Sequence, residues 1–342
     1  MKKLIFLFAM VFAVSMAMGQ NSGNVASVDQ YGSNIAEIEQ TGSNNTGDID
    51  QGTLGTPVTN NKVPSYAGDW IGGAFIDQIG DGNDAAINMH NGGNNGSSVY
   101  QYGNDNKGYQ DIGTSHSIGT SWDLMGVDLD QLGNNNWATQ TTVASFGSAG
   151  VKRMFVLQDG NYNVADQLSV GGYVNAQDIT QIGNNNNNPT QSGNTYDISA
   201  TTLADPLSLA WAHKPVGDFT QYANQMRGTS HIYVEGNDNN TFQYQEYTVW
   251  SLSGQNDAWM DIYGNGNDVA QGQLGEYNSS DIDIDGDGNV VTSSQLGDSN
   301  TIDIDLVSGS NNCVVGVEQI GDSHSATVFQ SGVSNFAKVI QQ

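Results

Sequence analysis

The chain has 342 residues, and glycine (43), asparagine (39) and glutamine (26) together make up about a third of it. Only 13% of the residues are charged, and 36 acidic against 9 basic residues give a formal net charge of −27. Soluble globular domains carry about 25% charged residues, whereas disordered chains are poor in aromatic and β-branched residues. With 9% aromatic residues, the composition favours a repetitive β-structure over an enzyme core or a flexible tail.

Charge and cysteine content exclude several kinds of partner and site. Binding to phosphates needs clustered lysine and arginine, so we expect no nucleic-acid partner. Cys313 is the only cysteine, so the chain forms no internal disulfide. One cysteine and five scattered histidines also argue against a structural zinc site. We therefore expect neither a metal nor a cofactor.

Residues 1–19 have the pattern of a secretory signal peptide. Two lysines precede an apolar stretch at 4–18, which ends in the small-x-small sequence Ala-Met-Gly. The stretch is too short for a membrane span, and a polar chain follows it at once. The sequence thus predicts cleavage between Gly19 and Gln20 and a secreted protein, extracellular or at the cell surface, that comprises residues 20–342.

One short motif recurs through the chain: glutamine, any residue, glycine, and asparagine three residues after the glycine. Gly and Asn tolerate positive φ, so each motif predicts a tight turn. In the C-terminal third the motif glycines are 11 or 12 residues apart. The predicted turn glycines are Gly80, Gly103, Gly133, Gly160, Gly183, Gly264, Gly275, Gly286, Gly297, Gly309, Gly321 and Gly332.

The residues after each turn alternate in character. In QSGVSNFAKVIQ, Asn335, Ala337, Val339 and Gln341 are two residues apart, which places them on one face of a strand. Each unit of about 11 residues is then one strand and one turn. A single strand cannot bury its inner face alone, so two units form one coil and successive coils stack about 4.8 Å apart. The predicted fold is an all-β solenoid.

The inward amides are expected to form ladders along the stack, as in cross-β assemblies, around a thin core of Ile, Val and Ala. The predicted ladder residues are Gln78, Asn83, Gln101, Asn106, Gln131, Asn136, Gln181, Asn186, Asn267, Gln273, Asn278, Asn289, Gln295, Asn300, Asn312, Gln319, Gln330 and Asn335.

The pattern Q-x-G-x-x-N-x-A-x-x-x-Q, which covers most of residues 21–342, resembles the curlin repeat of curli subunits, the extracellular functional amyloid of bacteria. The resemblance implies a secreted β-solenoid that polymerises outside the cell and supports adhesion and biofilm matrix. It also implies an outer-membrane secretion pore and a nucleator subunit as partners. The chain is longer than the compact family pattern.

Five stretches exceed one repeat unit and are predicted to be insertions: 53–76, 109–127, 140–157, 194–219 and 241–262. They hold four of the five prolines and five of the six tryptophans, including Trp259. Proline cannot donate to a central ladder, so we expect loops or longer arcs here. Two interpretations of the tryptophans stay open: they cover a sheet face or edge, or they form an aromatic surface that binds polysaccharide or a neighbouring fibre.

The best candidate for a metal site is the run Asp281, Asp283 and Asp285 before Gly286, which matches the start of a calcium loop. Thr292 stands where such a loop needs a bidentate glutamate. The alternative is strand alternation, in which the intervening isoleucines point inward and the aspartates point to water.

No nucleophile elbow, Walker-type lysine or distinct carboxylate pair indicates catalysis, so we expect no enzyme. Two functions remain open: a structural subunit that self-assembles into fibres, and a monomeric surface adhesin whose loops bind polysaccharide or host ligands.

Overall fold

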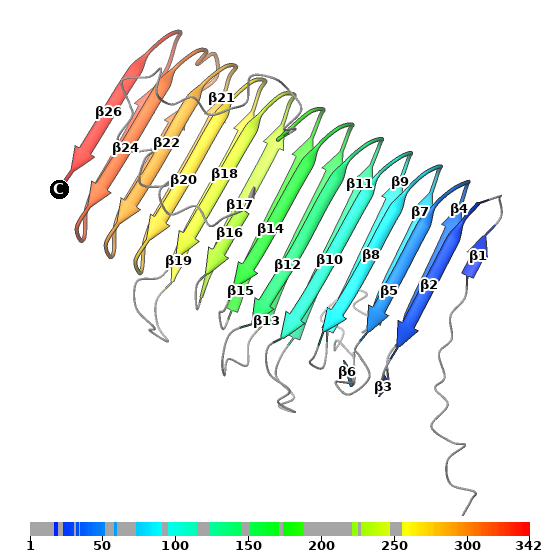
Figure 1. Cartoon of the computed structure of the whole chain (residues 1–342). Helices are drawn as coiled ribbons and strands as arrows, with labels where there is room; N and C mark the ends of the chain where they lie inside the picture. The colour runs from blue at the N-terminus through cyan, green and yellow to red at the C-terminus, as the bar shows by residue number, and fades with distance from the viewer. Residues whose placement is uncertain are drawn as a thin grey trace, which may run out of the picture.

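The computed structural model describes residues 17–19, 23–30, 32–33, 35–51, 58–59, 73–90, 95–114, 124–144, 151–170, 174–187, 221–224, 227–246 and 255–342. Every regular element in these ranges is a β-strand, and none of them contains a helix long and apolar enough to cross a membrane. The strands form two parallel sheets of 12 strands each, A and B, which stack coil upon coil (Figure 1). This confirms the predicted all-β solenoid.

The odd-numbered strands from β7 onward belong to sheet A and the even-numbered strands from β8 onward to sheet B. Sheet A contains β1 (Ala17–Gly19), β4 (Ala36–Thr41), β7 (Gly73–Ile79), β9 (Asn95–Tyr102), β11 (Leu124–Leu132), β13 (Val151–Asp159), β15 (Val174–Ile182), β17 (Arg227–Glu235), β19 (Asn256–Tyr263), β21 (Ser279–Asp285), β23 (Thr301–Leu306) and β25 (Ser325–Gln330). Sheet B contains β2 (Val25–Gln30), β5 (Thr46–Gln51), β8 (Asp84–His90), β10 (Lys107–Thr114), β12 (Trp137–Ala144), β14 (Val164–Val170), β16 (Gln221–Asn224), β18 (Asn240–Glu246), β20 (Asp268–Leu274), β22 (Val290–Leu296), β24 (Val314–Ile320) and β26 (Phe336–Gln341). A small third sheet pairs β3 (Gly32–Ser33) with β6 (Val58–Thr59).

The length of a coil varies along the chain. In the C-terminal third, Gln273 pairs with Gln295, 22 residues later, as predicted for two units. Farther toward the N-terminus, Gln101 pairs with Gln131, 30 residues later. Chain order and stacking order agree throughout, so the first and last coils lie at opposite ends of the solenoid (Figure 1).

Most arcs from sheet A to sheet B have four or five residues, whereas the connections from β15 to β16 and from β23 to β24 are longer. The stacking of the coils requires the glycines of the short arcs. Gly103 has a φ of +132°, and a Cβ added to it would lie 1.8 Å from the carbonyl oxygen of Gly133 in the next coil. Any larger residue would push adjacent coils apart. Glycine therefore serves both the turn geometry and the close approach of two backbones.

Apolar side chains fill the space between the sheets. On β8, Ala85, Ile87 and Met89 are buried while the residues between them face outward. Strand β21 alternates in the same way, with its aspartates exposed. This is the pattern of strands with one buried and one solvated face.

Sheet B departs from this alternation in its C-terminal half. The outward side chains of β18, β20, β22 and β24 are buried as well. On β20, β22 and β24 most of these positions hold small residues, among them Ala270, Gly272, Ser294 and Gly316, whereas β18 has Phe242 and Tyr244. Both faces of these strands are therefore buried, which the sequence pattern did not indicate.

The predicted insertion ranges are too wide. Strands β10 and β11 occupy both ends of 109–127, β12 and β13 both ends of 140–157, and β18 and β19 both ends of 241–262. Strand β6 lies within 53–76 and β7 begins near its end, whereas 194–219 lies outside the described residues. The alternation continues past the expected strand ends, and Trp259 belongs to β19 rather than to a loop. The long connections between β5 and β7, β10 and β11, β12 and β13, and β18 and β19 all lead from sheet B to sheet A.

Candidate functional site: the amide ladders and coil ends

A column of buried glutamines runs along the sheet A strands, two residues before each arc glycine. Within it, Gln101 donates from Nε2 to Gln131 Oε1 at 2.8 Å, and Gln131 donates to Gln158 Oε1 at 2.9 Å. The column comprises Gln40, Gln78, Gln101, Gln131, Gln158 and Gln181. The predicted ladder residues Gln78, Gln101, Gln131 and Gln181 thus lie in one column.

Each amide in this column also reaches across to sheet B. Gln101 Nε2 donates to the carbonyl oxygen of Asp84 at 3.1 Å, and Gln131 Nε2 to that of Lys107 at 3.0 Å. Both N–H groups of the amide are used, one along the stack and one between sheets. A fully satisfied amide can be buried at little cost, whereas a half-satisfied one costs about 1–3 kcal/mol.

The glutamine column changes sheets in the C-terminal half. From β17 to β23 the sheet A position holds Val234, Ile262, Ile284 and Leu306 instead. In sheet B the corresponding position holds Gln245, Gln273, Gln295, Gln319 and Gln341, joined by bonds of 2.7–3.1 Å. The predicted residues Gln273, Gln295 and Gln319 therefore form a different column from Gln78.

A third column lies in the middle of sheet B and was missed by the sequence reasoning. Gln110 donates to Gln140 at 2.8 Å and Gln140 to Gln167 at 3.0 Å, and farther along Gln243 donates to Gln271 at 2.8 Å. These glutamines stand seven residues after an arc glycine, where an apolar residue was expected. Their recurrence at that offset is the signal that could have revealed them.

Asparagines form ladders in the arcs. The backbone N–H of Asn136 donates to Asn106 Oδ1 at 3.0 Å, and Asn136 Nδ2 donates to the Gly160 carbonyl oxygen at 2.9 Å. The predicted residues Asn83, Asn106, Asn136, Asn186, Asn267 and Asn289 share the arc that leads from sheet A to sheet B. Asn278 and Asn300 form a second ladder in the opposite arc, and Asn335 lies in the last arc, where its backbone carbonyl bonds the N–H of Val314.

The prediction of Asn312 as a ladder residue is wrong by one position. The column continues from Asn289 to Cys313, whose backbone N–H donates to Asn289 Oδ1 at 2.9 Å, while Asn312 is exposed. Gly309 lies in a turn with a φ of +86°, and the neighbouring Ser310 is the residue that lies against Gly286 in the stack. The connection between β23 and β24 is longer than the other arcs of this region, which shifts the repeat.

All the glutamine ladders run in the same direction. In each pair, Nε2 of the glutamine nearer the N-terminus donates to Oε1 of the glutamine in the next coil. We call this direction the polarity of the ladder. At the C-terminal end the sheet A column, apolar over the preceding coils, returns to glutamine at Gln330. Gln330 is buried, and its Oε1 atom has no hydrogen-bond partner in the described part of the chain. The last coil thus ends in Gln330 and Gln341, and the first begins with Gln40 and Gln30 at the same two column positions.

Both ends of the solenoid leave strand edges open. In the sheets as described, nothing pairs with the outer edges of β25 and β26 or with that of β2. Unpaired edges of this kind are templates for another chain. Several exposed apolar side chains also lie in the terminal coils: Val25, Ile35, Phe329, Val333, Phe336 and Ile340.

The acidic run of β21 lies on the outer face of sheet A. Asp281 pairs with Asp303 and Asp283 with Asp305 on the next strand. Partial burial first, and then the neighbouring aspartates, Asp281 foremost, raise the pKa of Asp283 to about 6. Among the described residues no group of three His, Cys, Asp or Glu side chains has the arrangement of a metal site. The alternation of outward aspartates with buried isoleucines accounts for the run.

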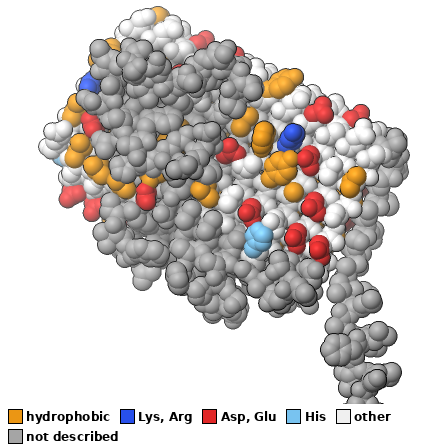
Figure 2. Space-filling model, viewed as in Figure 1, with side chains coloured by type: hydrophobic (Ala, Val, Ile, Leu, Met, Phe, Trp, Pro, Cys, Tyr) orange, Lys and Arg blue, Asp and Glu red, His pale blue; other side chains and the backbone are white. Residues whose placement is uncertain are grey.

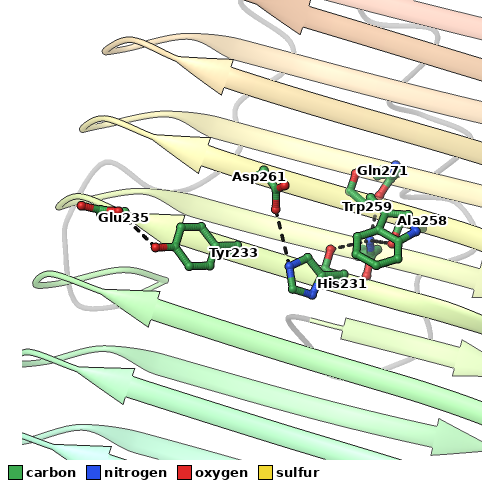
Figure 3. A network of polar contacts seen from close by, with 8 residues as sticks. His231, Tyr233, Glu235, Ala258, Trp259, Asp261 and Gln271 are labelled. Carbon is green, nitrogen blue, oxygen red and sulfur yellow. Dashed lines mark hydrogen bonds and ion pairs between the residues drawn. The ribbon is translucent and has the colours of Figure 1, made fainter.

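A contact network between β17 and β19 occupies the same face (Figure 3). His231 Nε2 lies 3.5 Å from Asp261 Oδ1, and the rings of His231 and Trp259 are 4.9 Å apart. Tyr233 donates its hydroxyl to Glu235 Oε2 at 3.1 Å. The contacts of His231 connect neighbouring coils, whereas Tyr233 and Glu235 lie on the same strand. Acidic side chains are spread over the described surface elsewhere (Figure 2).

No known protein family matches the chain, and no characterised protein matches it in sequence.

Proposed function

We propose that the protein is a secreted structural subunit that self-assembles head to tail into extracellular, curli-like fibres supporting adhesion and biofilm matrix. The match between the two ends of the solenoid carries this proposal. A second copy placed against the last coil sets its Gln40 against Gln330 and its Gln30 against Gln341, so both ladders continue with unchanged polarity.

Backbone pairing supports the same arrangement. Strands β25 and β26 present open edges at one end and β2 presents one at the other. Stacking a second copy pairs these edges and covers the apolar side chains of both terminal coils. A subunit of this kind needs no enzymatic activity, metal or cofactor. Its partners are further copies of itself, and by resemblance a secretion pore and a nucleator subunit.

The test uses the purified chain 20–342. We expect time-dependent thioflavin fluorescence, fibres in electron micrographs and a cross-β reflection near 4.8 Å. The chain 20–329, which lacks β26 and the last ladder residues, is the matched control and should elongate much more slowly. A persistent monomer that binds polysaccharide would instead favour the adhesin. Equal growth of the two chains would show that the C-terminal coil is not part of the interface between copies.

A further inference from the structure

The first strand of sheet A, β1, belongs to the segment predicted to be the signal peptide, which is called the leader below. β1 lies at the outer edge of the sheet and pairs in parallel with β4. Ala17 pairs with Ile38, Met18 with Glu39 and Gly19 with Gln40. We infer that the end of the leader caps the N-terminal edge of sheet A, so that the precursor is blocked for assembly until the leader is removed. This inference rests on the proposed head-to-tail assembly.

The predicted cleavage position coincides with the end of the cap. β1 ends at Gly19, and cleavage between Gly19 and Gln20 removes all of it. The next strand, β2, begins at Val25 and belongs to sheet B. Cleavage therefore leaves the first coil intact and exposes the edge of β4 alone.

The cap occupies the position that an incoming copy needs. In the proposed assembly, β25 of one copy pairs with β4 of the next, which sets Gln330 against Gln40. In the uncleaved chain Gly19 holds that place. Glycine has no side-chain amide, so the sheet A ladder stops at Gln40. β1 also uses the backbone groups of β4 through which a second copy would pair.

Only one end of the precursor is blocked. The edges of β25 and β26 stay open in sheets A and B, so an uncleaved copy can still dock its last coil onto the free β4 of a mature fibre. That copy then presents its own capped edge, and growth at this fibre end stops. The precursor is thus expected to act as a chain terminator rather than as an inert species.

The experiment compares seeded growth by 20–342, by the full chain 1–342 and by a chain that starts at Ala17. The last keeps β1 but lacks most of the apolar stretch, which separates capping from nonspecific aggregation. We expect one-tenth molar 17–342, added to 20–342 with sonicated fibre seeds, to slow elongation several-fold, and 1–342 to do the same. The control is 17–342 with Met18→Pro and Gly19→Pro, because adjacent prolines remove N–H groups from both sides of the strand. This control should not slow growth.

A second measurement detects the pairing of β1 with β4 directly. Amide hydrogen exchange at residues 38–40 of the monomer should be slower in 17–342 than in 20–342, and the two prolines should abolish the difference. Equal growth and equal exchange of 17–342 and 20–342, with fibres formed by both, would overturn the cap while leaving the assembly proposal in place. Failure of 20–342 itself to form fibres would overturn both.

Discussion

Asp281 on β21 and Asp303 on β23 are direct neighbours across two adjacent strands, and both side chains are exposed on the outer face of sheet A. Asp283 and Asp305 repeat the arrangement two residues farther along. Like charges directly opposite each other on neighbouring strands are destabilising. The solenoid therefore stacks carboxylates at close spacing, and its stability depends on their ionisation.

Acidification should stabilise the fold. The pKa of Asp283 is raised to about 6 from 3.8, first by burial and then by its acidic neighbours, and that of Asp281 is also raised. The folded state thus binds protons more tightly than the unfolded chain, so stability rises as the pH falls through about 6 toward 4. We expect a higher unfolding temperature at pH 5 than at pH 7.5. Mildly acidic pH and added salt should also accelerate fibre growth.

Asp283→Asn tests the cause of this pH dependence. The variant should be more stable at pH 7.5, on the order of 1 kcal/mol after allowance for solvent screening, and should respond less to pH. Asp285→Asn is the control, because Asp285 pairs with Tyr263 rather than with an aspartate. An equal effect of both substitutions would show that the aspartate column is not responsible.

Truncation of a ladder glutamine should be costly. Gln131 accepts from Gln101 and donates to Gln158 and to the Lys107 carbonyl oxygen. Gln131→Ala leaves these buried groups unsatisfied and should lower the free energy of unfolding by about 2–4 kcal/mol. Leu132→Ala, at the exposed neighbouring position, should change it by less than about 1 kcal/mol. Chemical denaturation measures both; similar losses would contradict the importance of the ladder.

The arc glycines should differ sharply in their tolerance of alanine. Gly103→Ala places a Cβ 1.8 Å from the Gly133 carbonyl oxygen, and we expect a loss of at least about 3 kcal/mol or failure to fold. Gly309 has a φ of +86° but nothing within 4 Å of an added Cβ. Gly309→Ala should therefore cost only the left-handed backbone conformation, about 1 kcal/mol. Thermal unfolding by circular dichroism distinguishes the two.

Cys313→Asn should restore the interrupted asparagine ladder. The thiol of Cys313 makes a weak contact of 3.3 Å to the Gly332 carbonyl oxygen, whereas Asn289 Nδ2 reaches the equivalent carbonyl of Ser310 at 2.8 Å. An amide at 313 can make the stronger bond, and we expect a gain of about 0.5–1 kcal/mol in the free energy of unfolding. Cys313→Ala, which makes neither contact, is the control and should be less stable than the natural chain. Destabilisation by asparagine as large as that by alanine would exclude the ladder explanation.

Gln330→Leu should impair assembly without harming the monomer. The substitution copies Leu306, its neighbour in the column, so a leucine fits the packing of the coil. It removes the amide that meets Gln40 of the next copy, and seeded elongation should slow about tenfold, corresponding to about 1.4 kcal/mol at the interface. Gln342→Leu, exposed beyond the last strand, should elongate normally. Unchanged growth of the Gln330 variant would show that the sheet A ladder does not cross the interface.

The local sequence pattern was sufficient to predict the solenoid architecture. Alternation in QSGVSNFAKVIQ predicted that Asn335, Ala337, Val339 and Gln341 share one face, and the glycine spacing predicted two units per coil. These features follow from neighbouring residues, because strand periodicity and positive φ in a turn are local properties. The solenoid and its inward amides could therefore be inferred without tertiary information.

Tertiary structure decided which side chains become neighbours along the stack. Coils of 21 to 54 residues bring together strands whose register no local pattern reveals. Only the pairing of β21, β23 and β25 shows that the sheet A column is apolar at Ile284 and Leu306 and returns to glutamine at Gln330. Only the stack shows that Cys313 replaces an asparagine. Each amide in a ladder is satisfied by residues one coil away, so its bonding depends on coil length and register rather than on the sequence beside it.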